Sequence, residues 1–197
     1  MTPDLIQIID CLTPAQVEMV LANLSDDWWQ PTTIFGNSGC EVNKEIRNNH
    51  RICLDDNSRA AQIMHEGMNK ALLTYRDNMF DITTEFQKYP VPGSYRTNSY
   101  REAIQVLRYR EEEFYSWHHD QASADVNEKN RTISVVLYLQ NATEGGRTMF
   151  PHRAYRPKAG QALIFPSNWC FPHSAEPVKA GTKIAAVTWY HCHYNND

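Results

Sequence analysis

Two hydrophobic periodicities divide the chain near residue 101. In the N-terminal half, two stretches have apolar residues at every third or fourth position, which is typical of amphipathic helices. Thr13 is suited to cap the first helix, with Gln16 completing a capping box, and this helix is predicted to end near Ser25. The second is predicted to begin at a cap in residues 56–58 and to end near residue 78.

After residue 102 the period changes to two, which indicates β-strands separated by glycine-containing turns. A short apolar stretch at 5–9 is a further strand candidate, whereas the polar residues 36–50 are predicted to form a loop. Short strands that follow two helices favour an α+β chain, mainly β, built as a helix-backed sandwich or jelly-roll. The strands are expected at 103–110, 132–139, 147–150, 161–165 and 184–192.

Residues 81–101 contain two prolines and three tyrosines but no regular period, which predicts a long connection. Long connections inside compact domains are often lids or binding loops. Tyr95 and Tyr100 are candidates for one wall of a binding groove, and an ordinary surface excursion is the alternative interpretation.

The length of 197 residues suits one catalytic domain, with helical support and a long loop over 1–101 and a β core over 102–192. A net charge of −4 gives no reason to expect nucleic acid or a membrane as partner. The five cysteines include no C-x-x-C pair, which favours a reducing, cytoplasmic setting.

The most informative polar cluster is His118-His119-Asp120, followed 53 residues later by His173. Residues 105–109 have the pattern of a strand, in which side chains two positions apart share a face. If that backbone continues, His118 and Asp120 point the same way and His119 points elsewhere. Two histidines and one carboxylate are the metal ligands of non-haem iron(II) oxygenases. We therefore predict His118, Asp120 and His173 as metal ligands; a polar loop with a surface histidine is the alternative.

Four ordered motifs extend this cluster over about residues 104–192. They are Leu107-Arg108-Tyr109 with Tyr115 through Asp120, the strand-like run Arg131 through Leu139, the G-G-x-T-x-F-P run Gly145 through Pro151, and an H-x-x-x-P-V-x-x-G-x-K run from His173 to Lys183. Together they resemble the prolyl 4-hydroxylase branch of the 2-oxoglutarate and iron(II)-dependent dioxygenases.

The resemblance implies a double-stranded β-helix, a jelly-roll of the cupin-like type, backed by the N-terminal helices. It implies that His118, Asp120 and His173 hold Fe(II) between the sheets. It also implies 2-oxoglutarate and O2 as cosubstrates, with ascorbate as the reductant.

Four further residues are implied around the cosubstrate. Lys183 matches the cation that pairs with the C5 carboxylate of 2-oxoglutarate. Tyr109 matches a tyrosine near the cosubstrate, and Tyr138 matches one that can hydrogen-bond the same carboxylate. Trp189 matches an aromatic residue beside the pocket in some members, although all three aromatic residues also suit a plain hydrophobic core.

The activity that the resemblance implies is 4-hydroxylation of a proline in a peptide or protein, with release of succinate and CO2. Other targets stay open: a lysyl residue, a free amino acid, or a basic protein such as a ribosomal protein. A jelly-roll metal enzyme without 2-oxoglutarate and a non-catalytic metal-binding module are further alternatives. The run Arg110-Glu111-Glu112-Glu113-Phe114 departs from the family, which often has glycines there. Its three acids could attract a basic substrate or form a solvated loop.

Overall fold

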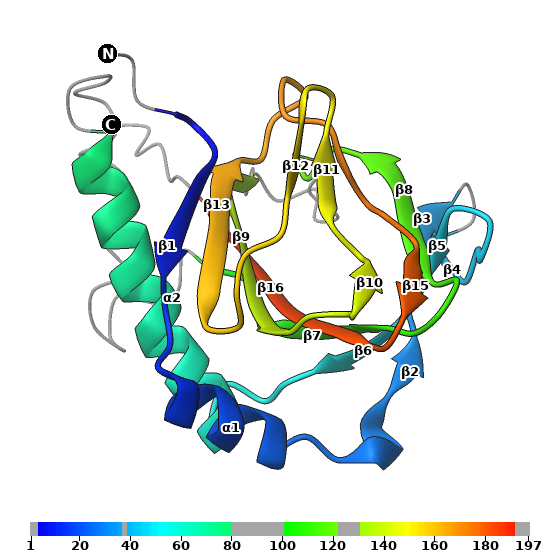
Figure 1. The fold of residues 1–197 in the computed structure, drawn as a ribbon, viewed down its shortest axis with the longest axis horizontal. Coiled ribbons are helices and arrows are strands. Elements are labelled where there is room, and N and C mark those ends of the chain that lie inside the picture. The colour runs from blue at the N-terminus through cyan, green and yellow to red at the C-terminus, as the bar shows by residue number, and fades with distance from the viewer. Residues whose placement is uncertain (1–3, 37–38, 80–100, 122–130, 192–197) are drawn as a thin grey trace.

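The computed structural model describes residues 4–36, 39–79, 101–121 and 131–191, and its strands form two main sheets with antiparallel pairing throughout. The major sheet has seven strands, and the N-terminal half of the chain supplies three of them (Figure 1). In spatial order they are β1 (Gln7–Asp10), β13 (Gln161–Pro166), β9 (Arg131–Gln140), β16 (Lys183–His191), β7 (Gln105–Tyr109), β6 (His50–Cys53) and β2 (Gln30–Pro31).

The second sheet faces the major one, and the two sheets close around a common interior (Figure 1). Its five strands are β12 (Arg153–Tyr155), β11 (Thr148–Phe150), β14 (His173–Ala175), β8 (Phe114–His118) and β5 (Arg47–Asn48). Two small strand pairs complete the fold: β10 (Glu144–Gly145) with β15 (Val178–Ala180), and β3 (Ile34–Gly36) with β4 (Gly39–Glu41).

Both helices begin at the caps that the sequence predicts. Helix α1 (Pro14–Ala22) has a complete capping box between Thr13 and Gln16, although it ends three residues earlier than expected. Helix α2 (Arg59–Asn78) begins at Ser58, whose hydroxyl accepts a hydrogen bond from the backbone of Ala61. A short 3-10 turn (Asp26–Trp28) follows α1. Among the described helices, none is both long and apolar enough to cross a bilayer.

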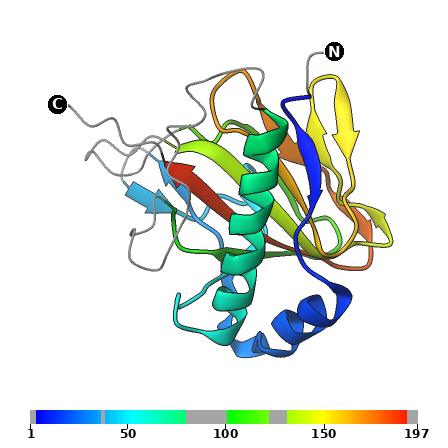
Figure 2. The ribbon, with the colours of Figure 1, turned by 90° about the vertical axis from the view of Figure 1, so that its left-hand side faces the viewer.

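Helix α2 lies across the outer face of the major sheet, as Figure 2 shows. Its apolar stripe includes Met64, Met68 and Tyr75, which are fully buried in one cluster with Val106 of β7 and Val135 of β9. Burying a side chain of this size contributes roughly 1.5–3 kcal/mol. The helices therefore support the sheet from outside, and the inner face remains available for polar chemistry.

The connection from β1 to α1 approaches the turn before β13 closely. Gly160 in this turn has φ +87°, and its backbone oxygen accepts hydrogen bonds from the backbone of Cys11 and Leu12. A Cβ atom at Gly160 would lie 2.4 Å from the oxygen of Leu12. Only glycine satisfies both the positive φ and this approach.

The prediction of a loop over residues 36–50 is wrong, because β4 and β5 lie within it and β3 and β6 reach its two ends. These strands are two to four residues long, too short for a period of two to stand out from the polar residues around them. The N-terminal half is thus more than a helical support with a loop. The predicted long connection at 81–101 falls, except for Arg101, outside the described residues.

Candidate metal and cosubstrate site

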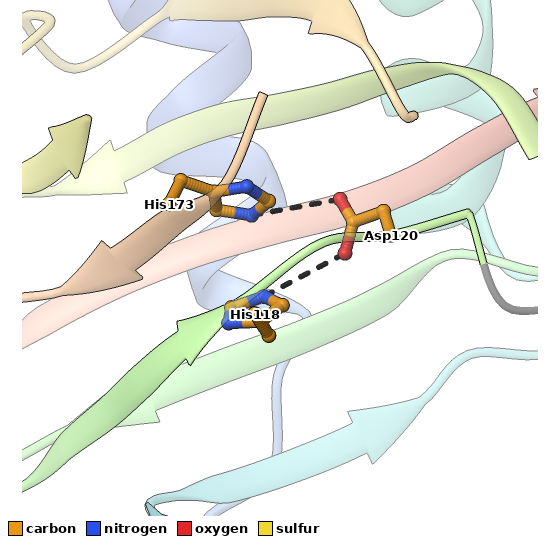
Figure 3. A group of neighbouring side chains, drawn as sticks. All are labelled: His118, Asp120 and His173. Atoms are coloured by element: carbon orange, nitrogen blue, oxygen red, sulfur yellow. Dashed lines mark ion pairs between the residues drawn. The ribbon is translucent and has the colours of Figure 1, made fainter. Parts of the chain in front are cut away.

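Three predicted ligands converge between the sheets (Figure 3). His118 ends β8 and His173 begins β14, and they are direct partners in the register of these neighbouring strands. Asp120 lies in a bend two residues beyond β8. Its Oδ1 lies 3.6 Å from Nε2 of His118, and its Oδ2 lies 3.6 Å from Nε2 of His173. One donor atom from each residue falls within a common span of 4.8 Å.

The histidine rings are held so that Nε2 faces the carboxylate. Nδ1 of His118 lies 2.8 Å from the backbone oxygen of Ser116, and Nδ1 of His173 lies 3.1 Å from that of Phe171. Because a carbonyl oxygen only accepts hydrogen bonds, each Nδ1 carries the proton and donates it. Each Nε2 then has a free lone pair, which is the form that binds a metal. Burial lowers the pKa of His118 to about 4, which favours this neutral form.

Asp120 is buried and has its own supporting hydrogen bonds. The hydroxyl of Ser134 donates to Oδ2 over 2.7 Å, and Ser134 is in turn 2.8 Å from the hydroxyl of Ser167. Burial acts to raise the pKa of Asp120, but the two histidines and hydrogen bonds from Trp189 and Ser134 outweigh it and lower the pKa. The carboxylate is therefore ionised and fixed in orientation.

Within the described ranges, His118, Asp120 and His173 are the single group of three or more His, Cys, Asp or Glu side chains placed to share a metal ion. His119 is exposed and lies outside this group, although it borders the same cavity.

Lys183, at the start of β16, is 3% exposed and borders the cavity that holds the three ligands. Its Nζ lies 5.2 Å from the ring centre of Tyr109 and 5.0 Å from that of Tyr138. In the described part of the chain, Nζ has no hydrogen bond and no ion pair. Burial lowers the pKa of Lys183 to about 7, opposed in part by Glu176. A buried cation without a partner is costly, so this position suits an incoming carboxylate.

The three predicted aromatic residues have different places. Tyr109 borders the cavity, and burial raises its pKa to about 12. Trp189 also borders it, and the Arg131 guanidinium lies 3.7 Å from its ring centre. Tyr138 is fully buried and does not border the cavity. Its hydroxyl forms a hydrogen bond with the hydroxyl of Thr148. Of these two hydroxyl groups, that of Thr148 is the one that borders the cavity.

Sequence reasoning missed several residues that support or border the site. Thr148 was within reach, because it is the threonine of the G-G-x-T-x-F-P run. Ser134 and Ser167 carry no local signal, since only the pairing of β9 with β13 brings them together. Arg47 is a third case: it lies over Tyr115, whose ring stacks on that of His118.

The cavity has a volume of about 620 Å³, within the range of small-molecule sites. The three metal-ligand candidates, Lys183 and Tyr109 are all part of its wall. It is large enough for a metal ion, a five-carbon dicarboxylate and part of a further substrate.

Residues 104–191 match the model of the 2OG-Fe(II) oxygenase superfamily. A putative prolyl 4-hydroxylase of Acanthamoeba polyphaga mimivirus is 35% identical over 107 residues, which cover 45% of this chain and 44% of that protein. The chain thus spans less than half the length of this curated relative.

Solved structures match over nearly the whole chain. The viral collagen prolyl hydroxylase of Paramecium bursaria Chlorella virus-1, in complex with 2OG, has a TM-score of 0.68 and 20% identity and covers 96% of this chain and 97% of its own. A prolyl hydroxylase from Trichoplax adhaerens, in complex with a peptide of hypoxia inducible factor, has a TM-score of 0.65 and 18% identity over 95% and 84% of the two chains. The predicted double-stranded β-helix is confirmed, and so is the predicted resemblance.

Proposed function

We propose that this chain, a prolyl 4-hydroxylase-like 2OG-Fe(II) oxygenase, hydroxylates a proline residue of a peptide or protein substrate. The observation that carries the proposal is that the His-Asp-His group and Lys183, which has no hydrogen bond or ion pair within the described ranges, face one cavity. A metal enzyme without 2-oxoglutarate, or a non-catalytic metal-binding module, has no use for such a lysine.

The donor set fits Fe(II). His118, Asp120 and His173 offer two imidazoles and one carboxylate within 4.8 Å of one another. The backbone oxygens behind both rings and the hydroxyl of Ser134 behind Asp120 hold these donors in a ligating orientation. When bound, iron(II) with 2-oxoglutarate and O2 supplies an oxidative decarboxylation that yields succinate, CO2 and a hydroxylated product, with ascorbate keeping the metal reduced.

The deep end of the cavity fits 2-oxoglutarate. Lys183 would pair with the far carboxylate, and such a charge-assisted bond offsets the cost of burying the ammonium group. The ring centres of Tyr109 and Tyr138 lie 5.2 and 5.0 Å from the Lys183 ammonium group, so aromatic surface adjoins it. Thr148 offers a hydroxyl at the same wall, and Trp189 closes the side near Asp120.

The peptide substrate is proposed on the relatives. The Trichoplax neighbour is in complex with a peptide, and the mimiviral relative is described as a putative prolyl 4-hydroxylase. A lysyl target is the nearest alternative, and the same assay distinguishes the two.

We also propose that residues 1–197 act as a single catalytic domain in a reducing, cytoplasmic setting. Strands β1, β2 and β6 share a sheet with β7, β9, β13 and β16, which supports one folding unit. The described cysteines (Cys11, Cys40, Cys53 and Cys170) are free thiols, which supports the setting.

The test is succinate release by the purified chain with Fe(II), ascorbate, 2-oxoglutarate and O2, with and without proline-rich and lysine-rich peptides. We expect peptide-dependent succinate, and a gain of one oxygen atom in mass on proline peptides. His118→Ala should abolish both signals. Oxygen gain on lysine peptides alone would replace proline with lysine as the target, and no succinate under any condition would refute the oxygenase.

A further inference from the structure

The charged side chains of the cavity wall do not balance. Counting histidines as neutral, four cations face two carboxylates among the described residues. Under the proposed function, Fe(II) adds two positive charges and 2-oxoglutarate adds two negative ones, so the loaded cavity keeps an excess of positive charge. The cations are Lys183, Arg47, Arg51 and Arg131, and the carboxylates are those of Glu102 and Asp120.

Three of the four cations already have a defined contact or role. Arg131 is held by Glu102 through two bonds of 2.6 and 2.7 Å. Lys183 is the candidate for the cosubstrate carboxylate, and the Arg47 guanidinium lies 4.4 Å from the ring centre of Tyr115.

Arg51 differs from these three. It is half-buried in the cavity wall, and over the described ranges its side chain has no hydrogen bond, ion pair or ring contact. A guanidinium in that position can turn toward a ligand without first breaking a bond.

The sheet register places Arg51 on the same wall as the cosubstrate site. Arg51 of β6 pairs with Leu107 of β7, which pairs with Ala185 of β16. Residues directly opposite each other share a face of the sheet, and neighbouring strands lie about 4.8 Å apart. Arg51 is therefore about 10 Å from Ala185 across the inner face, while Lys183 lies two residues from Ala185 on that face.

The acidic run gives no opposing charge at this wall. Glu111, Glu112 and Glu113 are absent from the cavity lining. Glu113 is buried, lies 3.1 Å from Nδ1 of His50 and accepts a hydrogen bond from the backbone of Arg110. The run therefore does not support a basic substrate attracted to the site.

We propose that Arg51 is a specificity-determining residue that binds an acidic side chain of the substrate peptide, close in sequence to the hydroxylated residue. The proposal rests on the proposed function, which identifies the site. It also rests on the sheet register and on a guanidinium group that has no partner among the described residues. An arginine–carboxylate pair is often bidentate, so it selects geometry as well as sign.

The test measures binding and turnover separately. The test peptides have a central proline, and their ends are acetylated and amidated so that the termini carry no charge. Each peptide has a single Asp, or the matching Asn, at one of the three positions before or after the proline. Their affinity is measured by fluorescence anisotropy on protein loaded with Co(II) and 2-oxoglutarate, and hydroxylation is measured with Fe(II). We expect one Asp position to bind about five- to tenfold tighter than its Asn counterpart. Added salt should reduce this preference.

Variants assign the effect to the side chain. Arg51→Gln should abolish the Asp preference, and Arg51→Glu should transfer it to a peptide with Lys at the same position. Arg153→Gln, at an exposed position of β12 that does not line the cavity, is the matched control and should keep the wild-type preference. Affinity for 2-oxoglutarate should stay unchanged in Arg153→Gln.

Equal binding of the Asp and Asn peptides, or a preference that persists in Arg51→Gln, would overturn the proposal. If binding shows the Arg51-dependent preference but no peptide is hydroxylated, the proposed function fails and the charge recognition stands. If peptides are hydroxylated but show no preference for Asp, the proposed function stands and the charge recognition by Arg51 fails.

Discussion

Replacing Lys183 with methionine should make the metal-free protein more stable while removing its capacity to bind 2-oxoglutarate. Methionine has a similar length and is apolar, so it fills the same space between Tyr109 and Tyr138. We infer that Lys183 is retained because it binds the cosubstrate, although it lowers the stability of the metal-free protein.

The size of the gain follows from the pKa. Burial lowers the pKa of Lys183 from 10.5 to about 7, and one pKa unit corresponds to about 1.4 kcal/mol. Below pH 7 the lysine is charged in both states, and its burial costs the folded protein about 4–5 kcal/mol. Between pH 7 and 10.5 the folded state binds fewer protons than the unfolded state, so the cost declines by about 1.4 kcal/mol per pH unit. At pH 8 it is about 3 kcal/mol, and contacts with the two tyrosine rings offset part of it.

The assay is urea unfolding of metal-free wild type and Lys183→Met at pH 7, 8 and 9. We expect the variant to be about 2–4 kcal/mol more stable at pH 7, with the difference shrinking as the pH rises. Lys179→Met is the matched control, because Lys179 is an exposed lysine on nearby β15, and it should have little effect. With Co(II) present, adding 2-oxoglutarate should raise the urea midpoint of the wild type. The urea midpoint of Lys183→Met with Co(II) should not change when 2-oxoglutarate is added. A variant of equal or lower stability, or a difference independent of pH, would refute the reasoning.

Three further changes test other parts of the site and fold. Ser134→Ala removes a donor to Asp120 and should weaken Co(II) binding in a titration by about tenfold, with recovery in Ser134→Thr; unchanged affinity in Ser134→Ala would contradict the supporting role. His119→Ala should leave Co(II) affinity unchanged, and a large loss would make this residue a ligand. Gly160→Ala forces a Cβ to within 2.4 Å of the oxygen of Leu12 at φ +87°, so urea unfolding should show a loss of about 2 kcal/mol or more. A loss below about 0.5 kcal/mol would mean that this turn adapts freely.

The sequence predicted the strands whose hydrophobic pattern follows from the burial of their own residues. Strands β9, β13 and β16 are long and largely buried, and their ends match the predicted ranges to within one residue. Strand β8 has no such pattern, because Phe114–His118 is mostly half-buried and contains the exposed Trp117. Its pairing with β14 and β5 defines it, and that pairing is a long-range property.

The same division applies to the site. The H-x-D spacing and the distant histidine predicted three donors that the structure brings together. Tyr138 stays a predicted cosubstrate residue: the structure gives its hydroxyl Thr148 as a partner and leaves it out of the cavity lining. Alternation along β9 sets the face on which Tyr138 lies, but Thr148 of the opposite sheet covers its hydroxyl. No local pattern carries that information.

The direct pairing of His118 with His173 determines when the site can exist during synthesis. These residues are 55 positions apart in the chain, yet they lie opposite each other on neighbouring strands. A growing chain that has not yet added residue 173 holds only two of the three donors of this site, His118 and Asp120. Full metal affinity at this site therefore requires that β14 has been synthesised and has paired with β8.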